Sequence, residues 1–503
     1  MKVYIVTAKE MYDIDNYTMK KIGMDGKLLM ENAGRAVSEK VERLIEKSDR
    51  ICIFVGPGNN GGDGFVIART LMNKRYDVTI VQVVPDEKIT GDALYHKNVF
   101  VNYGGSILIA QQESEVHDVT VNSDVVIDAI LGLGVKGDLR EGLITAVEVI
   151  NEVANRVISV DIPSGLPADE GMEEFTSVQA DFTIVIEAPK VSAFLQHTAL
   201  YYGVWDTVSI GLPLIAFQRY AKRNVWGYEQ FKDCMPRRDP YSHKGDHGKG
   251  LTIGGSATMP GSIVMTAKAA LRAGAGLITI GTSEKVINRI ASQCIEATYF
   301  PIHEQNNHPS IPFEEFDAIT IGMGMGRSGN AAALVAHVVE QTDCPLIIDA
   351  DGLFHVKTDL AKLKVRKSPT IVTPHPGEMA MLLDISVKEL LITPFYWSMK
   401  IAQTYNVYVV LKGKHTIITT PEGIQVVNKS GNAGLAKGGS GDVLAGILLA
   451  LVMQQRSVFQ ALCNACFIHG KAADLLVEET HSDQDLMASD VIEGISKVYR
   501  TLS

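Results

Sequence analysis

The chain has 503 residues, of which 46% are hydrophobic and 21% are charged, and its formal net charge is −11 at pH 7. This length suggests two to four globular domains, and the composition is that of an ordinary globular protein. The acidic balance, without an evident basic patch, argues against a protein that grips nucleic acid nonspecifically.

Predicted helices and strands alternate along the N-terminal half. Charge follows the first six residues at once, which is unlike a signal peptide. Thr7 and Glu10 fit a capping box that opens a first helix, and helical spacing of apolar residues predicts a second over 27–45. Apolar runs separated by helical stretches then predict strands at 51–55, 78–84, 125–131, 157–160 and 182–186. This pattern predicts a parallel sheet covered on both faces, which ends near Leu212, and we assign residues 1–220 to a first domain.

The alternation restarts in the C-terminal half. Residues 213–249 are less periodic and richer in charge, proline and aromatic residues, so we interpret them as a connection. Later strands are predicted at 251–253, 277–280, 318–321, 346–348, 370–372 and 407–411, followed by a hairpin of 415–419 with 424–427. Two helix-like segments close the chain. We therefore predict a second α/β domain over residues 221–503.

The apolar runs and the cysteines indicate the compartment. The longest apolar run, 443–453, falls well short of the roughly 20 residues that cross a membrane. The six cysteines are scattered, and only Cys463 and Cys466 lie close together, on one face of a predicted helix. Because no second pair or suitably spaced histidine completes a zinc site, buried core thiols are favoured over a redox or metal pair. We expect a reducing, cytoplasmic location and no membrane partner.

A glycine-rich loop follows the first strand of the N-terminal half. Residues 56–64 (Gly-Pro-Gly-Asn-Asn-Gly-Gly-Asp-Gly) contain G-x-G-x-x-G where a dinucleotide-binding turn belongs. Glycines let backbone N–H groups approach a phosphate, and a helix N-terminus favours its charge. The alternative, a tight turn that binds nothing, is less favourable with so many Gly and Asn residues. Asn59, Asn60 and Asp63 add side-chain oxygens that the usual dinucleotide turn lacks.

Three further segments are predicted to converge on the same site. Asp124 begins a strand, residues 128–134 (Asp-Ala-Ile-Leu-Gly-Leu-Gly) end it, and residues 161–165 (Asp-Ile-Pro-Ser-Gly) follow the next strand. Ligands of open α/β sheets bind beyond the carboxyl ends of strands, so we predict one site. Asp161, in a rigid turn, is the best general acid or base, with a cap or turn aspartate as an equally weighted alternative.

Four segments, in chain order, resemble the NAD(P)H-hydrate epimerase domain. They are 29–34 (Leu-Met-Glu-Asn-Ala-Gly), the loop 56–64, 128–134 and 161–165. The resemblance runs from Met1 to about Leu212 and implies a Rossmann-like αβα sandwich. It implies that Asp161 acts on the hydrated nucleotide, and that Asn60, Asp124 and Ser164 hold a potassium ion through oxygen ligands. The implied substrate contacts are Asn59, Asn60, Gly61, Gly62, Asp63, Asp128, Ala129, Ile130, Leu131, Gly132, Leu133, Gly134 and Asp161.

A second glycine-rich segment lies in the C-terminal half. Residues 434–442 (Gly-Leu-Ala-Lys-Gly-Gly-Ser-Gly-Asp) lead into an apolar helix predicted from Val443. Such a segment places N–H groups around an anion, and Asp442 in the first turn could take a proton from a substrate hydroxyl. An aspartate that only stabilises the helix dipole is the alternative. The motif 243–250 is not a P-loop, because Gly-Lys is followed by Gly, and an exposed lysine loop is its alternative interpretation.

The segment 434–442 resembles the anion hole and catalytic aspartate of ribokinase-like kinases. Together with 269–277, 373–379 and 412–416 it resembles the NAD(P)H-hydrate dehydratase domain, from about Tyr228 to Ser503. The resemblance implies a ribokinase-like α/β domain in which Asp442 is catalytic, His375 and Gly324 also contact substrate, and Mg²⁺ accompanies ADP or ATP. The implied nucleotide contacts are Lys412, Gly413, Lys414, His415, Thr416, Gly431, Asn432, Lys437, Gly438, Gly439, Ser440 and Gly441.

Two interpretations stay open in this domain. A core histidine is an equally weighted alternative for His375, although its flanking prolines indicate a loop. Asp349 and Asp351 end another strand, either in a turn or near magnesium and phosphate.

Together the two resemblances imply a repair enzyme for hydrated NADH and NADPH. The first domain would interconvert the R and S forms of the hydrate. The second would dehydrate the S form at the expense of ADP, giving AMP and phosphate. The expected partners are the hydrated nucleotides and an adenine nucleotide, and we expect a homo-oligomer. The main alternative is a ribokinase-type small-molecule kinase with a regulatory N-terminal domain; a noncatalytic N-terminal binding module and a dehydrogenase are further alternatives.

Overall fold

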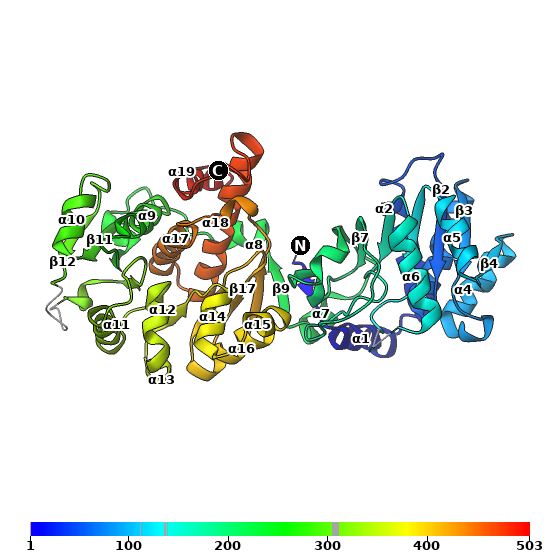
Figure 1. The fold of residues 1–503 in the computed structure, drawn as a ribbon, viewed down its shortest axis with the longest axis horizontal. Helices are drawn as coiled ribbons and strands as arrows, with labels where there is room; N and C mark the ends of the chain where they lie inside the picture. Colours follow the sequence, from blue (N-terminus) through cyan, green and yellow to red (C-terminus); the bar gives the residue numbers. More distant parts are fainter. Residues whose placement is uncertain (1, 111, 135–136, 138, 304–310, 503) are drawn as a thin grey trace. The chain divides into compact units, whose positions relative to one another are not determined.

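The computed structural model describes residues 2–110, 112–134, 137, 139–303 and 311–502, and Figure 1 shows its helices and strands. The chain divides into two units, Tyr4–Lys222 and Arg223–Ser503, and residues Met1–Val3 go with the second unit. Within the described ranges, no helix combines the length and the apolar character that a membrane span needs.

A single parallel sheet forms the centre of the N-terminal unit, in the order β4-β3-β2-β5-β6-β7-β8. The strands are β2 (Arg50–Val55), β3 (Asp77–Gln82), β4 (Ile107–Ile109), β5 (Val125–Ala129), β6 (Val157–Val160), β7 (Phe182–Ile186) and β8 (Val204–Val208). The helices are α1 (Ala8–Tyr17), α2 (Gly26–Val41), α3 (Asn59–Asn73), α4 (Gly91–Asn102), α5 (Glu113–Val121), α6 (Glu141–Val153) and α7 (Leu214–Tyr220).

Helices cover both faces of this sheet, because successive residues of its strands point to opposite sides. On β2, Ile51 and Ile53 join a core with the helices α2, α3 and α4, whereas Cys52 and Phe54 join a second core with α5 and α6. A strand buried on both faces reads as a continuous apolar run, as this one does. The predicted three-layer, Rossmann-like architecture is confirmed.

The sheet of the C-terminal unit runs in the order β9-β18-β17-β16-β15-β14-β13-β10-β11-β12. The strands are β9 (Arg223–Trp226), β10 (Lys249–Ile253), β11 (Leu277–Thr282), β12 (Thr298–Pro301), β13 (Ala318–Ile321), β14 (Leu346–Ile348), β15 (Thr370–Val372), β16 (Tyr408–Leu411), β17 (Thr416–Thr419) and β18 (Gln425–Asn428). Neighbouring strands are parallel except where β17 pairs with β16 and β18, so the predicted hairpin is confirmed within an α/β sheet.

Three helices of the C-terminal unit, α9, α18 and α19, pack against an apolar helix, α17 (Figure 1). The helices of this unit are α8 (Tyr228–Cys234), α9 (Pro260–Arg272), α10 (Glu284–Ile290), α11 (Gly329–Gln341), α12 (Asp351–Val356), α13 (Leu360–Lys364), α14 (Pro376–Leu383), α15 (Val387–Ile392), α16 (Pro394–Tyr405), α17 (Ser440–Gln454), α18 (Val458–Glu479) and α19 (Ala488–Arg500). Helix α17 is apolar all round, which is typical of a helix buried on every side. A Cβ atom on its Gly446 would lie 2.1 Å from the carbonyl oxygen of Thr266, so glycine lets α17 approach α9 closely.

The predicted core thiols are confirmed on α18. Cys463 and Cys466 are free and buried, and burial raises the pKa of Cys466 to about 12. A thiol that stays protonated is a poor metal ligand or redox group.

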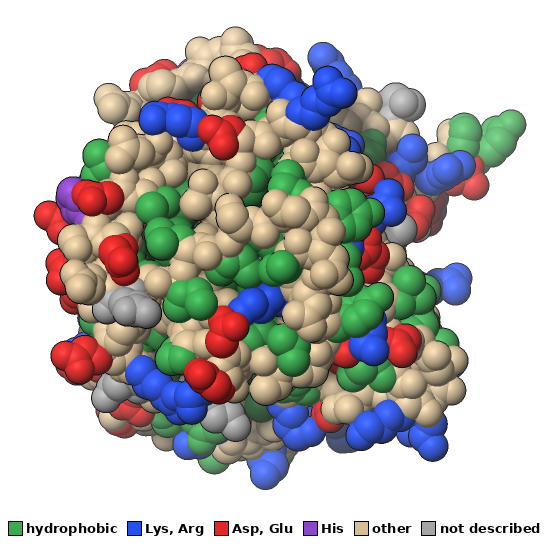
Figure 2. All heavy atoms as spheres, turned by 90° about the vertical axis from the view of Figure 1, so that its right-hand side faces the viewer, with side chains coloured by type: hydrophobic (Ala, Val, Ile, Leu, Met, Phe, Trp, Pro, Cys, Tyr) green, Lys and Arg blue, Asp and Glu red, His purple; other side chains and the backbone are tan. Residues whose placement is uncertain are grey.

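Figure 2 shows one face of the molecule, on which Lys and Arg side chains are interspersed among acidic and hydrophobic ones. This mixture accords with the net charge of −11 rather than with the basic stripe of a nucleic-acid-binding surface on this face.

Candidate active sites

The first glycine-rich loop brings two backbone segments into contact beyond the carboxyl end of β2. Strand β2 ends at Val55 and α3 begins at Asn59, as predicted for a strand–loop–helix turn. A Cβ atom on Gly56 would lie 2.0 Å from the carbonyl oxygen of Ile130, and one on Gly61 would lie 2.1 Å from the carbonyl oxygen of Gly56. A larger residue would therefore collide with the segment that follows β5 at position 56 and with the loop's own backbone at position 61.

A cavity of about 330 Å³ opens beside this loop. The predicted substrate contacts that line it are Asn59, Asn60, Asp63, Ile130, Leu131, Gly132, Leu133, Gly134 and Asp161. The other four, Gly61, Gly62, Asp128 and Ala129, are buried behind its wall and are not among its lining residues. Gly62 packs against Met30 of the 29–34 segment, where a Cβ atom would lie 2.3 Å from Sδ. The predicted contacts thus divide into residues that face the cavity and residues that support it.

Asp128 ties together the two loops that follow β5 and β6. Its carboxylate accepts hydrogen bonds from Ser159 Oγ at 2.8 Å, from Ser164 N–H at 2.8 Å and from Ser164 Oγ at 2.5 Å. Burial raises the pKa of Asp128, and the hydrogen bonds from Ser164 oppose that rise. This buried network is what brings the segments 128–134 and 161–165 together.

The three residues predicted to hold a potassium ion are not all brought together. Asn60 Nδ2 donates to the carbonyl oxygen of Leu131 at 2.9 Å, and Ser164 Oγ, which donates to Asp128, lies 3.2 Å from that oxygen and accepts from Leu131 N–H at 2.8 Å. Asp124, however, precedes β5 at the amino end of the strand, where it pairs with Arg50 Nε at 2.9 Å. A strand rises roughly 3.3 Å per residue, so β5 holds Asp124 on the order of 15 Å from the other two. The strand geometry therefore corrects the predicted set, because Asp124 cannot share an ion with Asn60 and Ser164.

Asp161 lies in the cavity wall and is held by a buried lysine that the sequence patterns did not single out. Lys190 Nζ donates to Asp161 Oδ1 at 2.5 Å, and Ile186 N–H donates to the same oxygen at 3.0 Å. Lys190 is 1% exposed, so this is a buried ion pair. Asp161 has φ of 66°, a left-handed conformation that is strained for a residue other than glycine and that clusters at functional sites. The position of Lys190, just beyond the end of β7, was the one available signal.

Two more carboxyl groups line the same cavity. Burial raises the pKa of Asp15, on α1, to about 6; Asp161 adds to the rise and Lys190 opposes it. Burial, with the charges of Asp161 and Asp15, raises the pKa of Asp63 well above its ordinary value. Carboxyl groups with raised pKa values in one cavity are typical of sites that perform acid–base chemistry.

The second glycine-rich segment forms the start of α17, as predicted. The helix begins at Ser440 after Gly439, which has φ of 94°. A Cβ atom on Gly439 would lie 2.7 Å from Met265 Sδ and 3.1 Å from Ala488 Cβ. Only glycine therefore fits at the helix start, where unpaired N–H groups favour an anion.

Asp442 follows in the first turn of α17. Burial raises the pKa of Asp442 to about 6, and the charge of Asp349 adds to the rise, whereas a hydrogen bond from Ser262 and the charge of Lys412 oppose it. A Cβ atom on Gly324 would lie 2.9 Å from Ser262 Oγ, which places Gly324 beside the residue that bonds to Asp442. The structure thus brings Gly324 and Asp442 to one place, and a carboxyl group that titrates near neutrality can exchange protons with a substrate.

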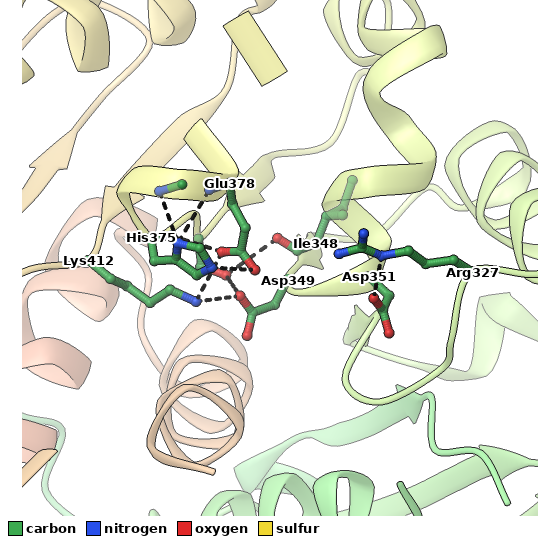
Figure 3. A network of polar contacts seen from close by, with 9 residues as sticks. Arg327, Ile348, Asp349, Asp351, His375, Glu378 and Lys412 are labelled. Carbon is green, nitrogen blue, oxygen red and sulfur yellow. Dashed lines mark hydrogen bonds and ion pairs between the residues drawn. The ribbon is translucent and has the colours of Figure 1, made fainter. Parts of the chain in front are cut away.

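Lys412 points toward two acidic residues, as Figure 3 shows. Its Nζ lies 2.8 Å from Asp349 Oδ1 and 3.7 Å from Glu378 Oε2, and Thr373 Oγ1 also donates to Asp349 Oδ1 at 2.7 Å. Burial lowers the pKa of Lys412, but Asp349 and Glu378 outweigh it, and the net pKa is raised. The ammonium is therefore a stable positive charge beside the start of α17, where a Cβ atom on Gly441 would lie 3.6 Å from Lys412 Nζ.

His375 starts α14 and is exposed, so the alternative of a core histidine is wrong. Its Nδ1 accepts from the N–H groups of Gly377 at 3.0 Å and Glu378 at 3.3 Å, and 57% of its side chain is accessible to solvent. Nearby, Asp351 accepts from Gly326 N–H and Arg327 Nε at 3.0 Å and 3.1 Å (Figure 3). Asp351 therefore holds the loop that follows β13.

A cavity of about 790 Å³ extends from the start of α17. The predicted nucleotide and substrate contacts that line it are His375, Lys412, Gly413, Lys414, Thr416, Gly431, Asn432, Lys437, Ser440 and Gly441. His415, Gly438, Gly439 and Asp442 belong to the same segments but are not lining residues, and Gly324 does not line the cavity either. Four discontinuous stretches of sequence therefore meet around one space that can hold a mononucleotide-sized ligand.

Two residues of α18 that were not predicted act at this cavity: His469 is in its wall, and Asp474 holds a loop that lines it. Asp474 accepts from Gly431 N–H at 2.9 Å and from Asn432 Nδ2 at 3.1 Å, which fixes the loop they form. His469 lines the cavity, and burial lowers its pKa to about 4, so the ring is neutral at pH 7. Both lie on a helix that looks like ordinary core, and no local signal marks them.

The motif 243–250 lies elsewhere. Asp246 and His247 line a separate pocket of about 390 Å³ with Arg237 and Arg238. Over the described parts of the chain, no three or more His, Cys, Asp or Glu residues form a cluster that could hold a metal ion by themselves.

Comparison with known proteins gives two family matches. Residues 26–192 match the model described as YjeF-related protein N-terminus, and residues 251–496 match the model described as NAD(P)H-hydrate dehydratase. The two matches fall on either side of the division between the two units.

Curated proteins match over nearly the whole chain. The bifunctional NAD(P)H-hydrate repair enzyme Nnr of Moorella thermoacetica is 33% identical, over 99% of this chain and 97% of its own. The protein of the same name from Escherichia coli is 31% identical over 93% of this chain and 89% of its own. Among solved structures, an ADP/ATP-dependent NAD(P)H-hydrate dehydratase from Bacillus subtilis, co-crystallised with ATP and Mg²⁺, is 33% identical. It covers 56% of this chain and 98% of its own, with a TM-score of 0.51.

Proposed function

The chain belongs to the family of bifunctional NAD(P)H-hydrate repair enzymes, and we propose that each of its two cavities performs one of the two activities. Residues 1–220 form the epimerase and residues 221–503 the ADP-dependent dehydratase. The observation that carries the proposal is the start of α17, where Asp442, with a pKa of about 6, follows a glycine-lined anion site beside a cavity of about 790 Å³.

In the N-terminal unit, the cavity beside the glycine loop takes the hydrated nicotinamide nucleotide. Asn59, Asn60 and Asp63 offer polar groups on one segment, and residues 130–134 offer backbone groups on another. Asp161 exchanges the protons of epimerisation, since Lys190 and the N–H of Ile186 keep its carboxylate in place. We keep a potassium ion in the proposal only for Asn60 and Ser164, with the Leu131 carbonyl between them as a further oxygen.

In the C-terminal unit, the poor leaving group of the hydrate must be made a good one. Asp442 takes the proton of the ring hydroxyl, the hydroxyl oxygen attacks the terminal phosphorus of ADP, and AMP leaves. The resulting phosphate ester then loses phosphate, and loss of a ring proton restores the double bond of NAD(P)H. The N–H groups at Gly439–Gly441 and the Lys412 ammonium stabilise the phosphoryl group during its transfer.

The residues near Lys412 fit a magnesium ion. Mg²⁺ in nucleotide sites is held by one or two carboxylates and by phosphate oxygens, and Asp349 and Glu378 supply such carboxylates here. Bound there, it would neutralise phosphate charge.

Restoration of the cofactor is the direct test of the dehydratase. We expect hydrated NADH, incubated with the protein, ADP and Mg²⁺, to regain the absorbance of NADH, with one AMP formed per NADH. Asp442→Asn should abolish this, and Asp490→Asn, at the start of α19, should not. If the protein instead phosphorylates small hydroxymethyl compounds and restores no NADH, the ribokinase-type alternative is correct.

The epimerase is tested without ADP or ATP, so that the dehydratase site cannot turn over. Resolved R or S hydrate should become a mixture of both, and Asp161→Asn should abolish the interconversion. Normal epimerisation by Asp161→Asn would contradict the role of Asp161. A cytoplasmic location and a homo-oligomer stay predictions.

A further inference from the structure

The helix that opens the N-terminal unit carries a carboxyl group into the epimerase cavity. Met11, Tyr12, Asp15 and Met19 all line the cavity. Met11, Tyr12 and Asp15 lie on one face of α1 (Ala8–Tyr17), and Met19 follows in the π-helical turn Thr18–Ile22. The capping box at Thr7 fixes the start of this helix. Asp15 is therefore built into the wall of the cavity from an element that neither the glycine loop nor the Asp161 loop belongs to.

Asp15 differs from Asp161 in its partners. Lys190 Nζ lies 2.5 Å from Asp161, whereas the hydrogen bonds and ion pairs of the described residues include none to the side chain of Asp15. Burial raises the pKa of Asp15 to about 6, and the charges of Asp161 and Glu187 add to the rise. The charged and titratable groups that face Asp15 are Tyr12, Asp63, Asp161, Glu187 and Lys190.

The third carboxyl group of the cavity is less suited to exchange protons. Asp63 is 8% exposed, and burial with the charges of Asp161 and Asp15 raises its pKa well above its ordinary value. Asp15, by contrast, is half-buried and lines the cavity, so its carboxyl group can exchange a proton with a ligand there.

We propose that Asp15 is a catalytic residue of the epimerase, the general acid that works with the Asp161 carboxylate as general base. This inference rests on the proposed epimerase activity of the unit. Asp15 gives its proton to the ring hydroxyl as the C–O bond breaks, the lone pair of the ring nitrogen forms a C=N bond, and water leaves. A second water adds to the opposite face of that carbon, the C=N electron pair returns to nitrogen, and the water proton goes to Asp161.

The proton transfers of this step leave the two carboxyl groups ready for the reverse reaction. One turnover leaves Asp15 deprotonated and Asp161 protonated, which is the state that the opposite isomer needs. No oxidant or reductant is required, and the oxygen of the product comes from solvent.

The test compares Asp15→Asn with Asp13→Asn, on the same helix, and with Asp63→Asn, all without nucleotide. Asp13 is a matched control, because its carboxylate pairs with exposed Lys9 at 2.6 Å. We expect Asp15→Asn to slow interconversion of the isomers at least about 100-fold, the usual contribution of a general acid, and Asp13→Asn to leave it unchanged. Asp15→Asn removes an unpaired buried carboxyl group, so its unfolding temperature should not fall below that of the wild type.

Two further readouts separate catalysis from a structural effect. The wild-type kcat/KM should fall as pH rises above about 6, because Asp15 loses its proton. The residual kcat/KM of Asp15→Asn should lack this alkaline limb, that is, the fall with rising pH. In H₂¹⁸O, each interconversion should place one ¹⁸O in the hydroxyl group. Retained oxygen, an Asp15→Asn rate within threefold of wild type, or loss of the limb only in Asp63→Asn would each overturn the proposal. A wild type that does not interconvert the isomers would refute the epimerase function and this inference with it.

Discussion

Replacement of Asp442 by asparagine should make the C-terminal unit more stable and inactive at once. The pKa of Asp442 in the folded protein is about 6, against about 3.9 for an unperturbed aspartate. A difference of roughly two pKa units corresponds to about 3 kcal/mol. Because the folded state binds the proton more tightly than the unfolded state, ionisation of Asp442 lowers the free energy of unfolding as pH rises from about 4 to about 6. Asparagine does not ionise and avoids that loss.

Scanning calorimetry of the full chain measures the effect. ATP with Mg²⁺ should raise the transition of the unit that binds it and so identify it. At pH 7.5 that transition should lie roughly 5 °C higher in Asp442→Asn than in the wild type, and at pH 4 the two should coincide. Ser262→Ala is a control of opposite sign, because it removes a hydrogen bond that lowers the pKa of Asp442. A variant that melts at or below the wild type at pH 7.5, or that keeps its full advantage at pH 4, would refute the reasoning.

Three further predictions follow from single contacts. Asp161→Asn leaves the ammonium of Lys190, which is 1% exposed, without its carboxylate partner. Calorimetry should therefore show that the free energy of unfolding of the N-terminal unit falls by about 3–5 kcal/mol. A fall of less than about 1 kcal/mol would contradict the buried ion pair. Gly439→Ala forces a side chain into a left-handed, filled position, whereas a Cβ atom on Gly438 meets nothing within 4 Å. The first variant should lose roughly 2 kcal/mol in denaturant unfolding and Gly438→Ala almost nothing, and equal effects would be evidence against the close fit. Asp474→Ala frees the loop of residues 431–432, so calorimetric titration should show a roughly tenfold higher Kd for ADP, and an unchanged Kd would mean that the loop does not touch the nucleotide.

Much of the fold could be predicted from local patterns. Alternating apolar runs and helical stretches predicted two α/β units with parallel sheets, because a strand buried on both faces must be apolar throughout. The start of α17 was predicted for a similar reason: glycine turns and helix starts depend on residues within a few positions of one another. Asp442 and the loop 56–64 were therefore identified without knowledge of the fold.

The composition of each site depended on contacts that no short pattern contains. The family resemblance groups Asp124 with Asn60 and Ser164, but Asp124 precedes β5 and lies at the amino end of the sheet. Lys190 follows β7, the neighbour of β6, and from there it reaches Asp161. Asp474 lies on α18, which is separated from Gly431 in the sequence by the whole of α17. Asp15 enters the first cavity only because α1 packs beside it.

Local chemistry along the chain thus specified the elements, the glycine turns and two of the acidic residues proposed for proton transfer, Asp161 and Asp442. The order of the strands and the packing of the helices decided which charges surround each of those residues. The tertiary structure therefore decided their proton affinities. Electrostatic energies vary with distance and burial, and both are properties of the folded chain.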